Sequence, residues 1–121
     1  QKLYHIDIYE QVLKSLFKKL ITFVSMDKNQ IISSIKAEKP YLLKQFGVEE
    51  IAIFGSYARD EQHEDSDVDI LVSTKIKTLN NYFSLLDYLE SKIQKKIDLV
   101  TKHKRLSDRF SKLISKDMIY V

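Results

Sequence analysis

Apolar residues recur at helical spacing through the first part of the chain. Ile8, Val12, Leu16, Leu20 and Val24 follow one another every four positions, and this predicts an amphipathic helix over residues 8–24. A second helical pattern begins after Asp27, a typical N-cap residue. Pro40 is expected to end that helix or to start a new one, and Gly47 to stop the last turn.

The second part of the chain alternates strands with helices. Short apolar runs predict strands over 50–54, 67–73 and 96–101, with a short edge strand over 118–121. Helical spacing predicts a short helix or turn over 58–62, a helix over 80–94 and a last helix marked by Leu106, Phe110, Leu113 and Ile114. This alternation favours an α/β layer architecture.

Length and composition limit the classes of protein that the chain can represent. Its 121 residues suffice for one domain with a single core, and the hydrophobic and charged fractions of 44% and 31% are ordinary for a globular protein. The absence of cysteine excludes a disulfide framework and a thiolate metal site, and it fits a cytoplasmic protein. No apolar run reaches the roughly 20 residues of a membrane span.

The charge is distributed unevenly. Residues 1–48 carry +4, residues 49–73 carry −7 and residues 74–121 carry +6, which together give the net +3. An acidic centre in a basic protein is what a cation site would look like, although Glu61, Glu64 and Asp65 are expected only to be solvated side chains of a loop. The basic flanks favour an anionic ligand or partner without choosing among triphosphate, RNA and acidic protein.

Three carboxylates supply the candidate chemistry. Asp67 and Asp69 alternate along a predicted strand, so their side chains project to one face about 6–7 Å apart. Asp98 lies in another predicted strand, and the three groups converge if the two strands are neighbours. Clustered carboxylates repel one another, and a divalent cation such as Mg²⁺ relieves that repulsion. Two such ions would serve the attacking and the leaving oxygens of a phosphoryl transfer.

A small-residue turn precedes the acids. Gly55 and Ser56 follow a predicted buried strand directly, where glycine lets the backbone approach a phosphate and the serine hydroxyl adds a donor. Arg59 is expected to bring positive charge to the same pocket. Alone, Gly-Ser is an ordinary turn, but Asp is uncommon in strands, so the combination favours a site for a nucleoside triphosphate.

In this order and spacing the residues resemble the nucleotidyltransferase superfamily, whose DNA polymerase β-like members carry Gly-Ser, nine to twelve residues, Asp-x-Asp and a third acid. The chain is most similar to the minimal nucleotidyltransferases, small antitoxins found beside HEPN-domain toxins, over about 27–121. The resemblance includes Gly47-Val48, the run from Phe54 to Arg59, the run from Ser66 to Val72, Asp98-Leu99-Val100 and the closing Ile119-Tyr120-Val121.

The resemblance implies a fold and roles for the residues. The expected fold is a small mixed β-sheet flanked by helices, as in the polymerase β palm. Asp67, Asp69 and Asp98 would hold two Mg²⁺ ions, with Asp98 helping to activate the nucleophile, while Gly55 and Ser56 would hold the triphosphate of ATP. The family usually has glycine where this chain has Asp60, which puts the aim of Arg59 in question, although Asp tolerates a left-handed backbone.

The domain organisation follows the extent of the resemblance. Residues 26–121 are expected to form the minimal nucleotidyltransferase domain, and residues 1–25 an N-terminal helical extension whose apolar stripe needs burial. His5, His63 and His103 show no metal-ligand spacing. Whether the protein forms homo-oligomers stays open.

Three functions are consistent with these features. The first is transfer of AMP from ATP to a hydroxyl, a tyrosine of a partner HEPN toxin, which would neutralise the toxin. The second is a non-catalytic antitoxin that masks the toxin by binding it; the intact acids favour the first. The third is nucleotidyl transfer to a small molecule, for which the usual second domain is not seen. RNA tailing is disfavoured because nothing resembles a nucleic-acid-binding module.

Overall fold

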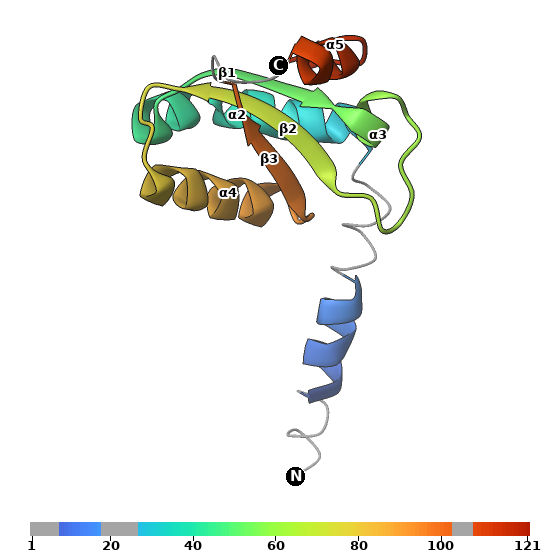
Figure 1. Cartoon of the computed structure of the whole chain (residues 1–121). Helices are drawn as coiled ribbons and strands as arrows, with labels where there is room; N and C mark the ends of the chain where they lie inside the picture. Colours follow the sequence, from blue (N-terminus) through green and yellow to red (C-terminus); the bar gives the residue numbers. More distant parts are fainter. Residues whose placement is uncertain (1–7, 18–26, 103–107) are drawn as a thin grey trace.

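The computed structural model describes residues 8–17, 27–102 and 108–121. Residues 8–17 are helical, as expected, and their large apolar side chains are exposed. The remainder of the helix predicted over 8–24 lies outside the described residues. Figure 1 shows the other elements gathered around a single sheet.

Helix α2 spans Lys28–Phe46 and begins as expected. The Asp27 side chain accepts a hydrogen bond from the backbone of Gln30, and the Gln30 side chain accepts one from the backbone of Asp27, which completes a capping box. At the other end Gly47, with a left-handed φ of 69°, closes the helix.

The expectation that Pro40 interrupts this helix was wrong. Pro40 lies inside α2, which continues for six more residues to Phe46. A proline in a helix deprives the carbonyl four residues earlier of its partner. That carbonyl belongs to Lys36, which is exposed, so water can satisfy it. Beyond Pro40, burial of Leu42 and Phe46 stabilises the last turn.

The sheet is mixed, with the strand order β3-β2-β1-β4. Strand β1 (Val48–Phe54) pairs antiparallel with β2 (Val68–Thr74) and with the short edge strand β4 (Ile119–Tyr120), whereas β2 pairs parallel with β3 (Ile97–Thr101). Each strand predicted from the sequence is present, with bounds shifted by one or two residues. The expected small mixed sheet with flanking helices is confirmed.

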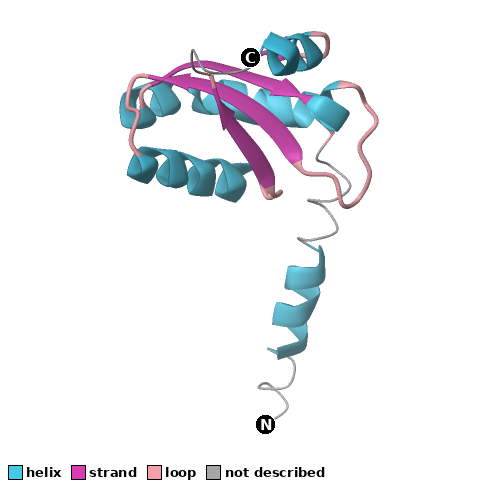
Figure 2. Ribbon diagram, in the orientation of Figure 1, coloured by secondary structure: helices cyan, strands magenta, loops and turns pink. Residues whose placement is uncertain are grey.

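The helices cover the sheet unequally (Figure 2). Helices α2 and α4 (Leu79–Ile93) lie against one face, and the main core forms there. Helix α5 (Asp108–Ser115) packs against the opposite face, where Ile114 meets Phe54 and Leu71 in a smaller cluster. The main core comprises Ile31, Ile35, Leu42, Phe46, Val48, Ile51, Ile53, Tyr57, Ala58, Val68, Ile70, Val72, Leu85, Leu89, Ile93, Ile97 and Leu99.

Strand alternation places the acids on the less covered face. Val68, Ile70 and Val72 point into the main core, so Asp69 and Leu71 point the other way. The short helix expected over 58–62 lies earlier, as α3 (Gly55–Ala58), and follows β1 without any connecting residue. None of the described helices is long and apolar enough to cross a membrane.

Candidate active site

Two of the predicted acids are direct neighbours across the parallel strand pair. Asp69 of β2 and Asp98 of β3 are register partners, so their side chains leave the same face of the sheet. Their carboxyl groups are close enough to hydrogen-bond to each other. The condition for convergence, that the two strands are neighbours, is met for Asp69 and Asp98, which are 29 positions apart in the sequence.

Asp67 lies one residue before β2 and is exposed. The backbone N–H of the next residue, Val68, donates to the carbonyl of Lys96 at 3.0 Å, which holds this end of β2 beside β3. The negative charge of Asp67 reaches Asp69, because it contributes to raising the pKa of the Asp69 carboxyl. Asp67 is therefore near the Asp69–Asp98 pair but lies just outside strand β2.

The surroundings of Asp69 disfavour its ionised form. Burial, the negative charge of Asp98 and then that of Asp67 raise the pKa of Asp69 to about 6, and its hydrogen bond with Asp98 acts in the same direction. Arg59 opposes this by lowering the pKa. A positive charge, either a proton or a bound cation, would therefore stabilise this group of carboxylates.

Gly55 is the residue against which Asp69 packs. Its φ of 74° is left-handed, and a β-carbon built at this position would lie 2.0 Å from Asp69 Oδ2. Only glycine satisfies both conditions. Because β1 pairs with β2 as far as Phe54 and Asp69, the Gly55-Ser56 turn starts beside the acids. Both turn residues are partly exposed, and α3 begins here without a side-chain cap.

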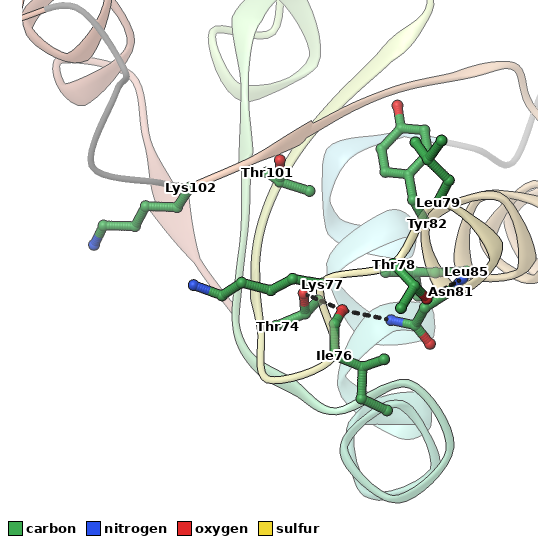
Figure 3. Close-up of a pocket in the computed structure, with 10 residues that line it drawn as sticks. All are labelled: Thr74, Ile76, Lys77, Thr78, Leu79, Asn81, Tyr82, Leu85, Thr101 and Lys102. Carbon is green, nitrogen blue, oxygen red and sulfur yellow. Dashed lines mark hydrogen bonds between the residues drawn. The ribbon is translucent and has the colours of Figure 1, made fainter.

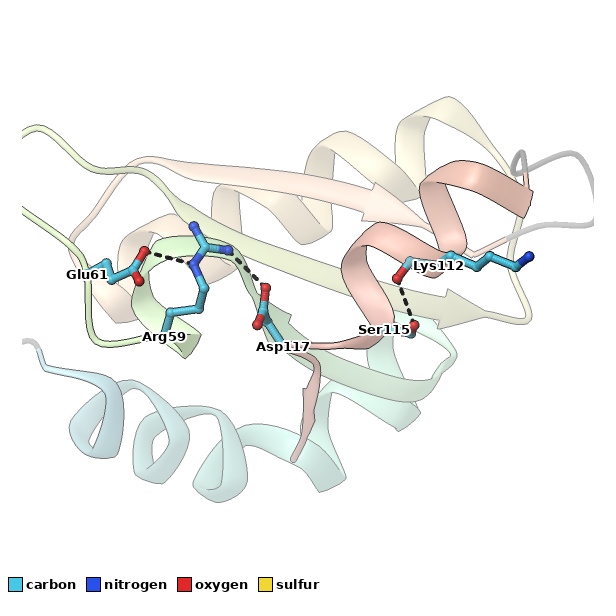
Figure 4. A network of polar contacts seen from close by, with 5 residues as sticks. All are labelled: Arg59, Glu61, Lys112, Ser115 and Asp117. Atoms are coloured by element: carbon cyan, nitrogen blue, oxygen red, sulfur yellow. Dashed lines mark hydrogen bonds and ion pairs between the residues drawn. The ribbon is translucent and has the colours of Figure 1, made fainter.

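Arg59 follows α3 and is held by two carboxylates (Figure 4). Its Nε donates to Glu61 at 3.0 Å, and its Nη1 donates to Asp117 at 3.0 Å. These two hydrogen bonds, the one to Glu61 first, raise the pKa of the arginine. Glu61 therefore does more than decorate a solvated loop. Sequence reasoning did not single out Asp117, since no local pattern links residues 58 positions apart.

The turn survives the replacement of the usual glycine by Asp60. Asp60 adopts a left-handed φ of 57°, as the sequence led us to expect. Its carboxylate accepts a hydrogen bond from Lys28 Nζ at 2.9 Å, which ties the start of α2 to this turn. The departure from the family pattern thus adds a contact between two elements without opening the turn.

The metal site expected from three carboxylates is incomplete as protein alone. No group of three His, Cys, Asp or Glu side chains within the described ranges is arranged to hold a metal ion. Asp69 and Asp98 nevertheless offer carboxylate oxygens, which Mg²⁺ prefers, and their mutual repulsion favours a cation. Because Mg²⁺ usually takes one or two carboxylates and completes its shell with substrate phosphates and water, the residues fit such an ion.

A cavity of about 280 Å³ lies elsewhere, at the far end of β2 and β3 (Figure 3). None of its lining residues is a predicted site residue. Thr74, on its wall, is five residues along β2 from Asp69, or about 16 Å. The residues that line the cavity are Thr74, Ile76, Lys77, Thr78, Leu79, Asn81, Tyr82, Leu85, Thr101 and Lys102. The candidate chemistry therefore lies on the open sheet face and not in this cavity.

Comparison with known proteins shows the family to which the chain belongs. The model of the nucleotidyltransferase domain family matches residues 35–121. A relative from Thermococcus cleftensis, the protein adenylyltransferase MntA, is 42% identical over 93 residues, which cover 76% of this chain and 93% of the relative. A relative from Methanocaldococcus jannaschii is 38% identical over 96 residues, covering 77% of this chain and 96% of its own length.

Solved structures show the same fold. A structure described as a minimal nucleotidyltransferase aligns with a TM-score of 0.65 and 29% identity, covering 78% of this chain and 96% of its own. A chain from an MntA–HpeT toxin–antitoxin complex with a tyrosine-to-alanine substitution aligns with a TM-score of 0.53 and 25% identity, covering 78% and 71%. On the strength of the matching family model and these relatives, the chain belongs to the nucleotidyltransferase family, and it is a nucleotidyltransferase.

Proposed function

We propose that this protein is an adenylyltransferase that moves AMP from ATP to a hydroxyl of a partner protein, a tyrosine of a HEPN toxin. The observation that carries the proposal is the carboxyl pair of Asp69 and Asp98 beside Gly55. The relative that is 42% identical is named a protein adenylyltransferase, and one structural neighbour comes from a toxin–antitoxin complex. Both support a protein acceptor.

The reaction needs a proton acceptor and a place for the phosphates. The acceptor oxygen attacks the α-phosphorus of ATP, the bond from that phosphorus to the bridging oxygen of pyrophosphate breaks, and pyrophosphate leaves. The hydroxyl proton passes to a carboxylate, and we assign this role to Asp98. Asp98 is exposed and so within reach of an incoming acceptor, whereas Asp69 packs against Gly55.

The nucleotide would lie along the turn between β1 and α3. Gly55 lets the turn pass directly beside the Asp69 carboxylate, and Ser56, the next residue, is partly exposed and has a hydroxyl to donate to a phosphate. Arg59 follows one turn later, and its positive charge already reaches Asp69. These three residues form our proposed triphosphate site.

Asp67, Asp69 and Asp98 are the residues that would hold Mg²⁺ in the complex with nucleotide. When bound, the cation would polarise the phosphates and neutralise the charge that develops on pyrophosphate. Asp69, partly protonated near pH 6, must be ionised to serve as a ligand. The site is therefore expected to load more fully above that pH.

The direct test uses the partner protein as the substrate. Wild-type protein is incubated with ATP, Mg²⁺ and a HEPN toxin, and intact mass spectrometry detects AMP-sized increments on the toxin. Asp69→Asn should abolish the increments. Glu50→Gln is the control, because it also removes a carboxylate of the same sheet, an exposed one that pairs with Lys102 away from the acids.

Two results would replace the proposal. If wild-type protein suppresses the toxin but leaves its mass unchanged, the protein is a masking antitoxin that acts by binding. If the toxin is neither bound nor modified while a small hydroxyl compound acquires AMP, the acceptor is a small molecule.

A further inference from the structure

Asp117 connects the C-terminal segment to the candidate active site. It lies between α5 and β4 and accepts a hydrogen bond from Arg59 Nη1 at 3.0 Å, across 58 positions of sequence. Figure 4 shows the two side chains directed toward each other from different elements. This Arg59–Asp117 salt bridge lies outside both hydrophobic clusters and is partly exposed, with side-chain exposures of 41% for Arg59 and 29% for Asp117.

Both residues of the salt bridge lie in segments that adjoin the C-terminal half of β1. On one side, the N–H of Arg59 donates to the carbonyl of Gly55, the first residue after β1, at 3.1 Å. On the other side, Asp117 lies two residues before Ile119, which pairs with Ile53 of β1. The N–H of Asp117 donates to the carbonyl of Ile114 at 3.3 Å. The segment that carries Asp117 and the Gly55-Ser56 turn are therefore both positioned by β1, through the pairing of β4 and through direct chain continuity.

The two carboxylates leave one edge of the guanidinium available. Glu61 takes Nε and Asp117 takes Nη1, while Nη2 has no hydrogen-bond partner within the described part of the chain. An arginine fixed in this way has already lost much of its rotamer freedom before a ligand arrives. A phosphate then meets an oriented donor in place of a freely moving side chain.

We propose that Asp117 is a positioning residue that holds the Arg59 guanidinium in place for the triphosphate of the nucleotide. This inference rests on the function proposed above. The role proposed for Asp117 is not a structural one, because exposed ion pairs contribute little to folding stability. Asp117 is expected to act on nucleotide affinity through Arg59 and scarcely on the stability of the fold.

A double-mutant cycle tests the link between the two residues. Calorimetry with Mg²⁺ and a non-hydrolysable ATP analogue gives the dissociation constant for wild type, Asp117→Ala, Arg59→Ala and the double variant. Asp117→Ala should weaken binding about fivefold, and Arg59→Ala at least tenfold. In the Arg59→Ala background, Asp117→Ala should have no further effect, because the group that it positions is gone.

A second substitution and a control keep the test sharp. Asp117→Asn keeps the shape and one hydrogen-bond acceptor, so its affinity should lie between wild type and Asp117→Ala, which also covers the case in which Asp117→Ala does not fold. Glu50→Ala breaks a more exposed salt bridge, to Lys102, and should leave the dissociation constant unchanged. Thermal unfolding of all variants is expected to stay near that of wild type.

Three outcomes would overturn the inference. Equal affinity of wild type, Asp117→Ala and Asp117→Asn would remove Asp117 from the site while leaving the proposed function intact. An equal loss of affinity in the wild-type and Arg59→Ala backgrounds would show that Asp117 acts independently of Arg59. A wild-type protein that does not bind the analogue would overturn the proposed function, and this inference with it.

Discussion

The carboxylate of Asp69 occupies the space that a side chain at Gly55 would need. A β-carbon at position 55 would lie 2.0 Å from Asp69 Oδ2, closer than real β-carbons approach another atom, and 3.0 Å from the Asp69 carboxyl carbon. The same glycine has a left-handed φ of 74°. The turn at Gly55 and the acid are therefore in direct contact, so that position 55 must be glycine as long as Asp69 keeps this place.

Gly55→Ala should damage both fold and site. A left-handed alanine costs about 1–3 kcal/mol, and the displaced Asp69 carboxylate should lose its alignment with Asp98. Urea unfolding and analogue calorimetry measure the two effects. Gly47→Ala is the matched control, since its φ is 69° but it contacts Lys75 and Ile76 and no acid. It should lose stability and keep nucleotide affinity; equal affinity in both variants would argue against a turn that holds phosphate.

Asp69 should make folding stability depend on pH. Its folded pKa of about 6 lies above the ordinary value of 3.8, so the folded state binds the proton more tightly than the unfolded state. The resulting stabilisation is complete below about pH 4 and is lost as pH rises through 6.

The Asp69→Asn variant isolates this contribution. Asn does not titrate, so the free energy of unfolding of wild type minus that of the variant should fall between pH 4 and pH 7. The expected fall is on the order of 1–2 kcal/mol, after allowance for solvent screening. Urea titrations without divalent ions at several pH values provide the measurement. Parallel pH profiles for the two proteins would contradict the raised pKa.

Asp98→Asn should separate nucleotide binding from transfer. Asp98 is exposed and is our candidate for the proton acceptor, a role worth about 10²–10⁴-fold in rate. The variant should bind the ATP analogue with Mg²⁺ within a few-fold of wild type and modify the partner at least 100-fold more slowly. Initial rates from intact mass give the comparison. Transfer at the wild-type rate would show that another group accepts the proton.

Residues 1–25 should be dispensable for the chemistry. The main and the smaller clusters of buried residues draw on residues from Ile31 onward, whereas the described helix at 8–17 exposes its large apolar side chains. A shortened chain that begins at Met26 should fold with unchanged thermal stability and bind nucleotide like the full chain. Analytical chromatography and circular dichroism check the first expectation. Aggregation of the shortened chain would show that the N-terminal segment covers part of the domain.

Local patterns predicted most of the elements. Caps such as Asp27 and Gly47 mark the ends of α2 because their effects involve neighbours within one turn. Pro40 misled the prediction, because its tolerance depends on the solvent exposure of its own turn and on core contacts made further along the helix. The helix propensity of proline takes account of neither the solvent exposure of its turn nor the core contacts further along the helix.

The candidate site was only partly predictable for a similar reason. Gly55, Asp69 and Asp98 follow from alternation along strands and from the spacing of motifs, and the structure brings these residues together. The partners of Arg59 do not follow in this way, since Asp117 reaches it only after β4 has joined β1. A pairing set by the tertiary fold leaves no periodic trace in the sequence.

The parallel pairing of β2 with β3 affects the order in which parts of the site form during folding. Asp98 joins Asp69 only after the chain has crossed over through α4, so no fragment that ends before Ile97 contains the carboxyl pair. Contacts so distant in sequence form late, since the intervening loop must close first. A chain still being synthesised can thus pair β1 with β2 before the carboxyl pair exists, and the candidate site is complete only after β3 has joined the sheet.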